Sequence, residues 1–172
     1  MIDFQLFESA YIVCIKQPNK YLSANFKKHL DKLFPQDSSA TSLKTPMVTG
    51  YYLRCTETLL NLKPAKKPDQ QIQNILNSKR NTKEKTEEIA NYLDKHNKIG
   101  LSEKIADYSL IPFEDTRKIF EAYAEDFVNN TLKEKEISKD NSEIFHELAY
   151  RNMAFGYLYK LAEEFIEKKS YN

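Results

Sequence analysis

The stretch that decides the fold is SEIFHELAYRNMAFGYLYKLAEEFIEKK, residues 142–169. Its apolar residues recur every three or four positions, which predicts one long helix with Ser142 as its N-cap. A helix with such a broad apolar face must be buried against other helices. The residues of this face are Ile144, Phe145, Leu148, Ala149, Phe155, Leu158, Leu161, Ala162 and Phe165.

Working outward, the preceding segment predicts the partner of this helix. Pro112 can start a helix over 113–135, because the first turn of a helix does not use the N–H that proline lacks. Together the two segments predict a long C-terminal helical hairpin. Apolar stripes at helical spacing predict further helices over 3–16, 20–34, 46–62 and 84–96, with shorter ones after Asp69 and over 103–109. We therefore expect an all-α fold, a compact bundle of about seven or eight helices.

The composition agrees with this fold class. The chain has 172 residues, of which 41% are hydrophobic and 30% charged, as in ordinary globular domains. It contains only 3 glycines. So few glycines leave little material for hairpin turns or phosphate-binding loops, which argues against an all-β fold and against most nucleotide enzymes.

The stretch KPAKKP, residues 63–68, predicts an exposed, semi-rigid linker, because two prolines and three lysines cannot pack a core. We therefore divide the chain into an N-terminal helical segment, 1–62, and a C-terminal helical unit, 69–172, that share one core. The net charge changes sign soon after the linker, from +6 over residues 1–82 to −5 over 83–172. Opposite signs indicate faces that pack together, surfaces with different partners, or simple drift of solvated faces.

The two cysteines, Cys14 and Cys55, are too few for a disulfide framework and predict buried thiols in a reducing cytosol. The chain opens on acidic residues and lacks the basic start and cleavage site of a signal peptide. No apolar run approaches the ~20 residues of a membrane span. We therefore expect a cytoplasmic, intracellular protein with no membrane span.

No catalytic or metal-binding set stands out. Three histidines, His29, His96 and His146, fall on separate predicted helices and do not form a zinc site with two cysteines. The phosphate-loop, dinucleotide and nucleophile-elbow motifs are absent, and the many carboxylates are interpreted as solvated charges. We therefore expect no enzymatic activity, no cofactor and no metal.

A basic stretch between residues 63 and 85 is the candidate partner-binding surface. Proline, Asn and Gln are interleaved with its cations, but aromatic residues are not, so the stacking platform of single-strand nucleic-acid binders is missing. A solvated linker, an acidic protein partner and a nucleic-acid backbone remain open as interpretations. The predicted contact residues are Lys63, Lys66, Lys67, Lys79 and Arg80.

Residues 89–123 resemble the helix-turn-helix hairpins of winged-helix and HU/IHF-like DNA-binding proteins. This resemblance implies DNA contacts within 102–123. Glu114 and Asp115 oppose it, because they stand at the leading end of the recognition helix, where phosphates approach. Packing within a bundle is the competing interpretation. The residues implied in DNA contact are Thr116, Arg117 and Lys118.

AYRNMAFGYLY, residues 149–159, resembles the RN…AHGY signature of the HEPN family, all-helical ribonucleases that use an Arg and a His of one helix. Phe155 takes the place of the histidine, and the spacing is one residue short. The resemblance implies a degenerate HEPN-like ribonuclease. The alternative is that Arg151 pairs with Glu147 four residues earlier on the helix.

These observations favour a non-enzymatic helical adaptor or regulatory protein that acts through protein–protein interaction, with another protein or with itself as a homodimer. The 11 tyrosines and 10 phenylalanines suit half-exposed grooves and interfaces. The alternatives are a nucleic-acid-binding regulator, using 102–123 or the basic segment 63–85, and the HEPN-like ribonuclease.

Overall fold

The computed structural model describes residues 3–35, 43–64, 66–95, 108, 113–133 and 139–170. Within these ranges the chain forms eight α-helices, one 3-10 turn and no strand, which confirms the predicted all-α bundle. The elements are α1 (Phe4–Ile15), α2 (Pro18–Tyr21), α3 (Ala24–Leu33), α4 (Lys44–Leu59), α5 (Gln70–Leu76), α6 (Thr82–Lys95), α8 (Phe113–Lys133), η2 (Lys139–Asn141) and α9 (Ser142–Ser170).

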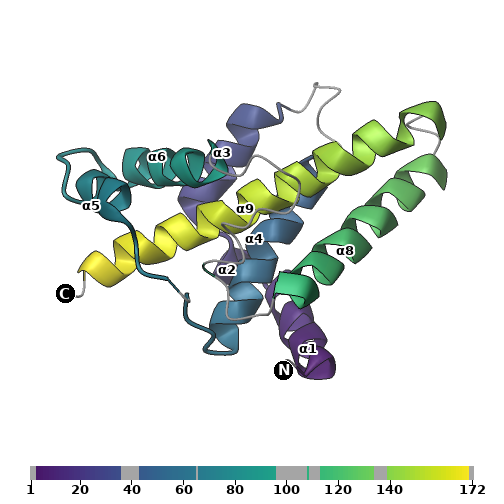
Figure 1. Ribbon diagram of the computed structural model, residues 1–172, viewed down its shortest axis with the longest axis horizontal. Helices are drawn as coiled ribbons and strands as arrows, with labels where there is room; N and C mark the ends of the chain where they lie inside the picture. Colours follow the sequence, from purple (N-terminus) through teal and green to yellow (C-terminus); the bar gives the residue numbers. More distant parts are fainter. Residues whose placement is uncertain are drawn as a thin grey trace.

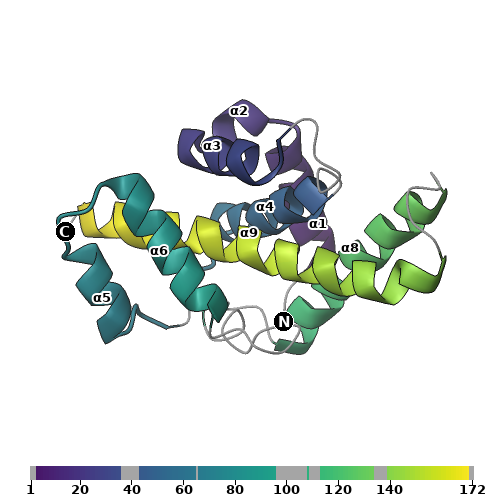
Figure 2. The same cartoon turned by 90° about the horizontal axis from the view of Figure 1, so that it is seen from above.

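The long helix α9 runs through the middle of the molecule (Figure 1). Helix α4 packs against it most extensively, followed by α6 and α8. Figure 2 shows α2, α3 and α4 on one side of α9 and α5 on the other, with α6 crossing in front of α9. The hairpin of α8 and α9 is present, and its Phe127 and Phe145 rings stack with centroids 5.6 Å apart. Buried residues from both sides of the 63–68 linker belong to one hydrophobic cluster.

Two glycines explain why α4 and α9 pack so closely. Gly50 of α4 lies against the carbonyl group of Met153, and Gly156 of α9 lies against the carbonyl group of Met47. A Cβ atom at either glycine would overlap the facing carbonyl oxygen. The two helices therefore cross backbone against backbone, at a distance that only glycine permits at these two positions.

The predicted helix over 20–34 is interrupted at Leu22 and Ser23. Leu22 has an extended backbone, and the Ser23 hydroxyl accepts a hydrogen bond from the Phe26 N–H at 3.0 Å. This cap starts a new helix, α3, after the single turn of α2. Leu33 is 42% exposed at the end of α3, whereas His29 is buried.

Other boundaries lie within three residues of the predictions where the structure describes them, the largest difference being the end of α4 at Leu59 instead of 62. Helix α4 begins at Lys44, so Pro46 falls in its first turn and does not begin it. Helix α6 starts two residues earlier than predicted, and α9 extends one residue further. The predicted helix over 103–109 lies outside the described residues except for Tyr108, which is buried.

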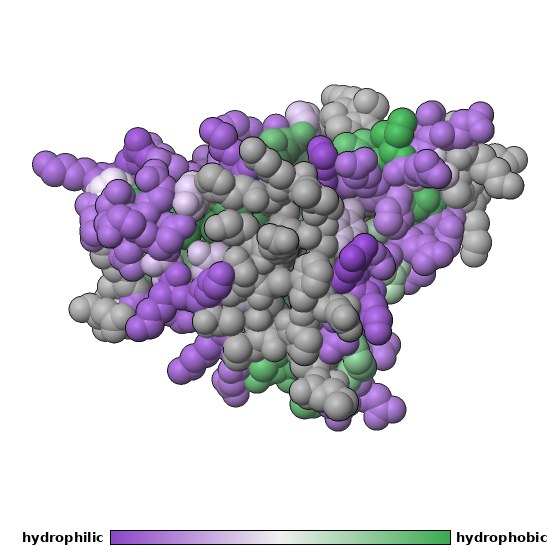
Figure 3. Space-filling model, in the orientation of Figure 1, coloured by the Kyte–Doolittle hydropathy of each residue, from purple (hydrophilic) through white to green (hydrophobic). Residues whose placement is uncertain are grey.

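The apolar face predicted for α9 is only partly buried. Ile144 is 63% exposed and Leu148 is 37% exposed, contrary to the prediction. Helix α4 crosses α9 near Gly156, so the first turns of α9 extend beyond it and α8 packs beside them. Figure 3 shows hydrophobic surface at this end of the molecule, and also at the lower edge, where α1 lies in Figure 1.

Candidate functional site

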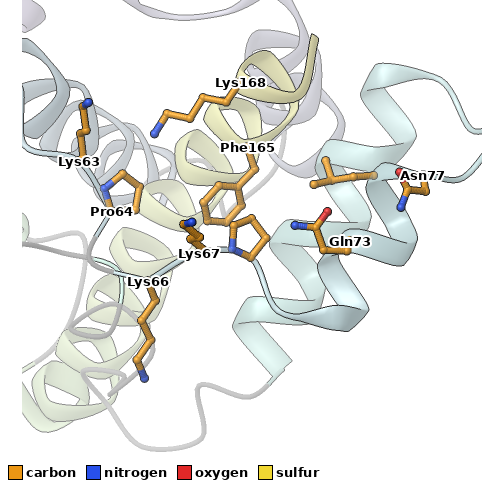
Figure 4. Close-up of a pocket in the computed structure, with 10 residues that line it drawn as sticks. Lys63, Pro64, Lys66, Lys67, Gln73, Asn77, Phe165 and Lys168 are labelled. Atoms are coloured by element: carbon orange, nitrogen blue, oxygen red, sulfur yellow. The ribbon is translucent and has the colours of Figure 1, made fainter. Parts of the chain in front are cut away.

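A hollow of about 410 Å³ lies between the 63–68 linker, α5 and the last turns of α9. Its volume is typical of ligand pockets, which measure roughly 300–1,000 Å³. Three of the predicted contact residues, Lys63, Lys66 and Lys67, line it, and α9 adds a fourth cation, Lys168. We call this hollow the lysine pocket (Figure 4).

The cations of the lysine pocket surround an apolar floor. Phe165 and Leu76 form that floor, and they are 4% and 5% exposed. Figure 4 shows Lys168 reaching over Phe165 toward Lys63, whereas Lys66 points away from them. No carboxylate is among the described residues that line the pocket. The pocket therefore combines concentrated positive charge with an apolar surface.

The first end of the linker is anchored by the end of α4. Asn61 has a positive φ of 61°, which turns the chain out of the helix. The Leu62 N–H then donates to the Glu57 carbonyl at 2.8 Å. The Arg54 Nη2 donates to the Leu62 carbonyl at 3.2 Å. These bonds hold the residue directly before Lys63, so the pocket begins at a defined position.

Arg54 belongs to a buried cluster of charges, which we call the Arg54 cluster. Arg54, Glu57 and Glu164 are 1%, 1% and 5% exposed. The Arg54 Nε donates to Glu164 at 2.8 Å, and its Nη1 donates to Glu57 at 3.2 Å. The Tyr157 hydroxyl donates to Glu57, and the Thr58 hydroxyl donates to Glu164. Every charged group in the cluster is therefore hydrogen-bonded inside the protein, and one guanidinium is shared by two carboxylates.

Burial lowers the pKa of Arg54, but Tyr157, Glu164 and Glu57 oppose it and leave the pKa above its usual value. Arg54 therefore keeps its charge in the folded protein. The sequence pattern does not reveal this cluster, because its many carboxylates are typical of solvated charges. The spacing of Arg54 and Glu57, three residues apart on a helix with an apolar face, is the only signal for it.

The second end of the linker is held by Asp69. Its carboxylate accepts from the Ile72 N–H at 2.9 Å and so caps α5, as the sequence predicted. The other carboxylate oxygen accepts from the Tyr92 hydroxyl at 2.8 Å, a bond that raises the pKa of Tyr92. The linker is thus fixed to α4 at one end and to α6 at the other.

The structure separates Lys79 and Arg80 from the lysine pocket. Both line a different hollow, between α5 and α6, that also contains Glu84 and Glu88. Arg80 forms an ion pair with Glu88. The basic stretch is therefore divided between two surfaces.

Lys168 is the cation that the sequence analysis did not select. It lies more than a hundred residues after Lys63, in the acidic half of the chain, so only the fold brings the two together. Phe165 stands three residues earlier on the same face of α9, which explains why both side chains reach one pocket.

Part of the helix-turn-helix resemblance lies outside the described residues, since 96–107 and 109–112 are not described. Thr116 lies in α8, but its side chain is outside the described part. Lys118 is exposed. Arg117 is also exposed and pairs with Glu121 at 3.1 Å, so an anion at this position would compete with a carboxylate.

The HEPN-like segment lies on α9 with its key residues engaged. Arg151 pairs with Glu147 at 3.1 Å, which is the alternative that the helical spacing predicted. Phe155 stacks on His29 with ring centroids 5.5 Å apart. Tyr157 is 1% exposed and bonds Glu57, so it cannot reach a substrate.

Among the residues described, no group of three or more His, Cys, Asp or Glu side chains could hold a metal ion. Both cysteines are buried free thiols, and burial raises the pKa of Cys55 to about 12. A thiol with that pKa is protonated at neutral pH and is a poor nucleophile. None of the described helices combines the length and apolar character that crossing a bilayer requires.

Comparison with protein-family models, with curated proteins and with solved structures found no match to this chain.

Proposed function

We propose that the protein is a non-enzymatic interaction module, an adaptor or regulator, that binds an acidic segment of a partner protein in the lysine pocket. One observation carries the proposal: lysines from two distant parts of the chain surround an apolar floor, and no described lining residue is acidic. A pocket of this composition complements a ligand that presents carboxylates around an apolar group.

The ligand chemistry follows from the lining residues. A lysine ammonium is a flexible point charge with three donors, so it accepts carboxylates in several geometries. Phe165 and Leu76 offer apolar surface beneath the charges. The expected ligand is therefore a short peptide in which Asp or Glu residues flank one large apolar side chain. Because the linker is anchored at both ends, little conformational entropy is lost on binding.

The same lysines could attract a nucleic-acid backbone, but the surroundings favour a peptide. Arg80 and Arg117, the arginines of the two candidate nucleic-acid surfaces, pair with Glu88 and Glu121. Phe165 is the single aromatic residue among the described residues that line the pocket, whereas single-strand binders stack successive bases on several rings.

The test is a fluorescence anisotropy titration with a labelled peptide, Asp-Glu-Phe-Glu-Asp, against the full chain. We expect a Kd on the order of 10–100 µM. Binding should weaken, and the Kd rise, as the salt concentration increases. The double variant Lys67→Glu/Lys168→Glu should weaken binding at least about tenfold, or ~1.4 kcal/mol. Lys28→Glu/Lys118→Glu is the matched control, because both lysines are exposed and lie on α3 and α8.

Equal binding of the amidated peptide Asn-Gln-Phe-Gln-Asn would contradict the role of the carboxylates. Equal weakening by the control variant would show that only the net charge of the protein matters. Duplex DNA and structured RNA enter as competitors. Tighter binding of either, with an affinity that falls about a thousandfold between 50 and 200 mM salt, would support the nucleic-acid regulator instead.

A further inference from the structure

Helix α1 is apolar on more than one face. Its buried face packs on α4 and α8, where the Tyr11 and Tyr123 rings lie 5.2 Å apart. Nine large hydrophobic side chains are exposed in the described residues, and five of them lie on α1. Exposed apolar side chains on both flanks of a surface helix indicate a further packing partner. The five exposed residues are Phe4, Leu6, Ile12, Val13 and Ile15.

We propose that α1 pairs antiparallel with α1 of a second copy of this chain, around a two-fold axis between Ser9 and Ala10. The symmetry of the helix itself supports this partner. Such an axis places residue 4 of one copy opposite residue 15 of the other, and residue 6 opposite residue 13. An isologous interface requires one surface patch that complements itself.

Four of the five exposed apolar residues meet this requirement. Phe4 would face Ile15, and Leu6 would face Val13, so both apolar pairs are centred on the same point. These four side chains are 49%, 41%, 56% and 40% exposed in the single copy. Antiparallel pairing would cover apolar surface with apolar surface on both flanks of the helix, which the hydrophobic effect favours.

The charges at the ends of α1 are symmetric about that point too. Asp3 caps the first turn, with its carboxylate accepting from the N–H groups of Gln5 and Leu6 at 3.0 and 3.2 Å. Lys16 stands at the other end. The proposed axis places Asp3 of one copy opposite Lys16 of the other, twice. Parallel pairing would instead bring like charges and like helix ends together.

A small residue lies where the helices would cross. Ser9 is exposed and next to the proposed axis. Its hydroxyl already donates to the Gln5 carbonyl at 2.9 Å, so covering it leaves no unpaired donor. A helix of 12 residues is only ~18 Å long. The interface is therefore small, and we expect a Kd on the order of 10–100 µM.

This inference does not depend on the proposed function, because α1 and the lysine pocket share no residue. The first test is sedimentation equilibrium of the full chain over a concentration series that reaches about 300 µM, above the expected Kd. We expect a monomer–dimer equilibrium for the unmodified protein. Leu6→Glu and Val13→Glu should each weaken it at least tenfold, since two-fold symmetry introduces every change twice.

Ile144→Glu is the matched control. Ile144 is 63% exposed on α9, so this variant removes an exposed apolar side chain elsewhere and should leave the dimer unchanged. Circular dichroism confirms that each variant keeps its helix content. A protein that stays monomeric at the highest concentration overturns the proposal. Dissociation by Ile144→Glu, with no effect of Leu6→Glu and Val13→Glu, also overturns it.

Disulfide trapping tests the direction of pairing. A mixture of Phe4→Cys and Ile15→Cys proteins should form a mixed disulfide dimer, and Ser9→Cys should cross-link to itself. The natural Cys14 and Cys55 are buried and do not compete. Asn130→Cys, exposed on α8, is the control that should stay uncross-linked. Efficient cross-linking of Phe4→Cys alone, without the mixed species, would indicate parallel pairing and contradict the proposed axis.

Discussion

The Arg54 cluster and the lysine pocket are both built from charged residues at the junction of α4, the linker and α9, yet they differ in every other respect. Arg54 is 1% exposed and contacts two carboxylates and a carbonyl oxygen. The lysine pocket gathers its cations at the surface, and no described lining residue is acidic. In the first arrangement the charged groups are hydrogen-bonded to one another, whereas in the second the lysines lie at the surface around an apolar floor.

The buried Arg54 cluster positions the segments that form the lysine pocket. Buried ion pairs add little net stability compared with apolar residues of similar size, but they favour one arrangement strongly, because a misplaced charge would be left unpaired. Arg54 joins Glu164 of α9 to the Leu62 carbonyl. The cluster thereby holds the linker and α9 together, and these two segments carry the lysines of the pocket.

The largest expected effect comes from removing one partner of the buried cluster. Arg54→Met leaves Glu57 and Glu164 buried without their cation, and we expect a loss of about 3–5 kcal/mol in unfolding free energy. For a chain of this length each kcal/mol lowers Tm by ~2–4 °C. Chemical and thermal unfolding followed by circular dichroism would measure the loss.

The triple variant Arg54→Met/Glu57→Gln/Glu164→Gln is the control for this experiment, because it removes the charges together. We expect it to recover most of the stability that Arg54→Met loses. If Arg54→Met were as stable as the unmodified protein, the carboxylates of the cluster would have to be accessible to water, which would contradict their burial.

The helix crossing that supports both regions is tested by Gly156→Ala. The new Cβ would overlap the Met47 carbonyl oxygen, and that oxygen is backbone that cannot rotate away. We expect a loss of about 1–3 kcal/mol or somewhat more, although alanine favours helix formation. Denaturant unfolding checks it, with Glu167→Ala, at an exposed position of the same helix, as a control. A stabilised Gly156→Ala protein would contradict the close crossing.

A smaller, pH-dependent effect is expected at His29, which is 7% exposed and lines a surface hollow. Burial lowers its pKa, and the Glu87 carboxylate, 3.4 Å from Nδ1, offsets this only in part, while Lys32 and Lys83 lower it further. The unfolded chain therefore binds the proton more readily, and stability must fall as pH drops through about 6.5.

His29→Phe keeps an aromatic ring beside Phe155 and Tyr159 but removes the proton. We expect the Tm of this variant to fall less between about pH 7.5 and 5.5 than that of the unmodified protein. The comparison of the two curves isolates His29 from other titrating groups. Parallel curves would show that His29 does not contribute.

The smallest expected effect lies in the lysine pocket itself. Lys67→Glu/Lys168→Glu should change the unfolding free energy by less than about 0.5 kcal/mol per site, because the pocket's cations are at the surface. The same variant should weaken peptide binding tenfold. In this variant the peptide affinity therefore changes while the free energy of unfolding hardly changes, whereas Arg54→Met lowers the free energy of unfolding strongly. A strongly destabilised variant would place these lysines in the structural network instead.

Helix α9 and Ser23 show which features of the fold the sequence pattern could predict and which it could not. The pattern of 142–169 predicted α9 to within one residue, because its apolar spacing is long and regular. The same pattern could not show that Ile144 and Leu148 lie beyond the reach of α4. Ser23 was missed as a cap, because the apolar stripe continues through it and hides the break between α2 and α3.

The sequence by itself determined the helical class, most helix ends and the position of the linker, since these depend on local spacing, caps and prolines. Only the tertiary structure decided which charges are buried and which are presented. Arg54 and Lys63 are both basic residues in the sequence. In the structure Arg54 faces α9, whereas Lys63 follows the anchored turn after α4. Lys168 joins the pocket for the same reason: the glycine-mediated crossing of α4 and α9 brings distant segments together.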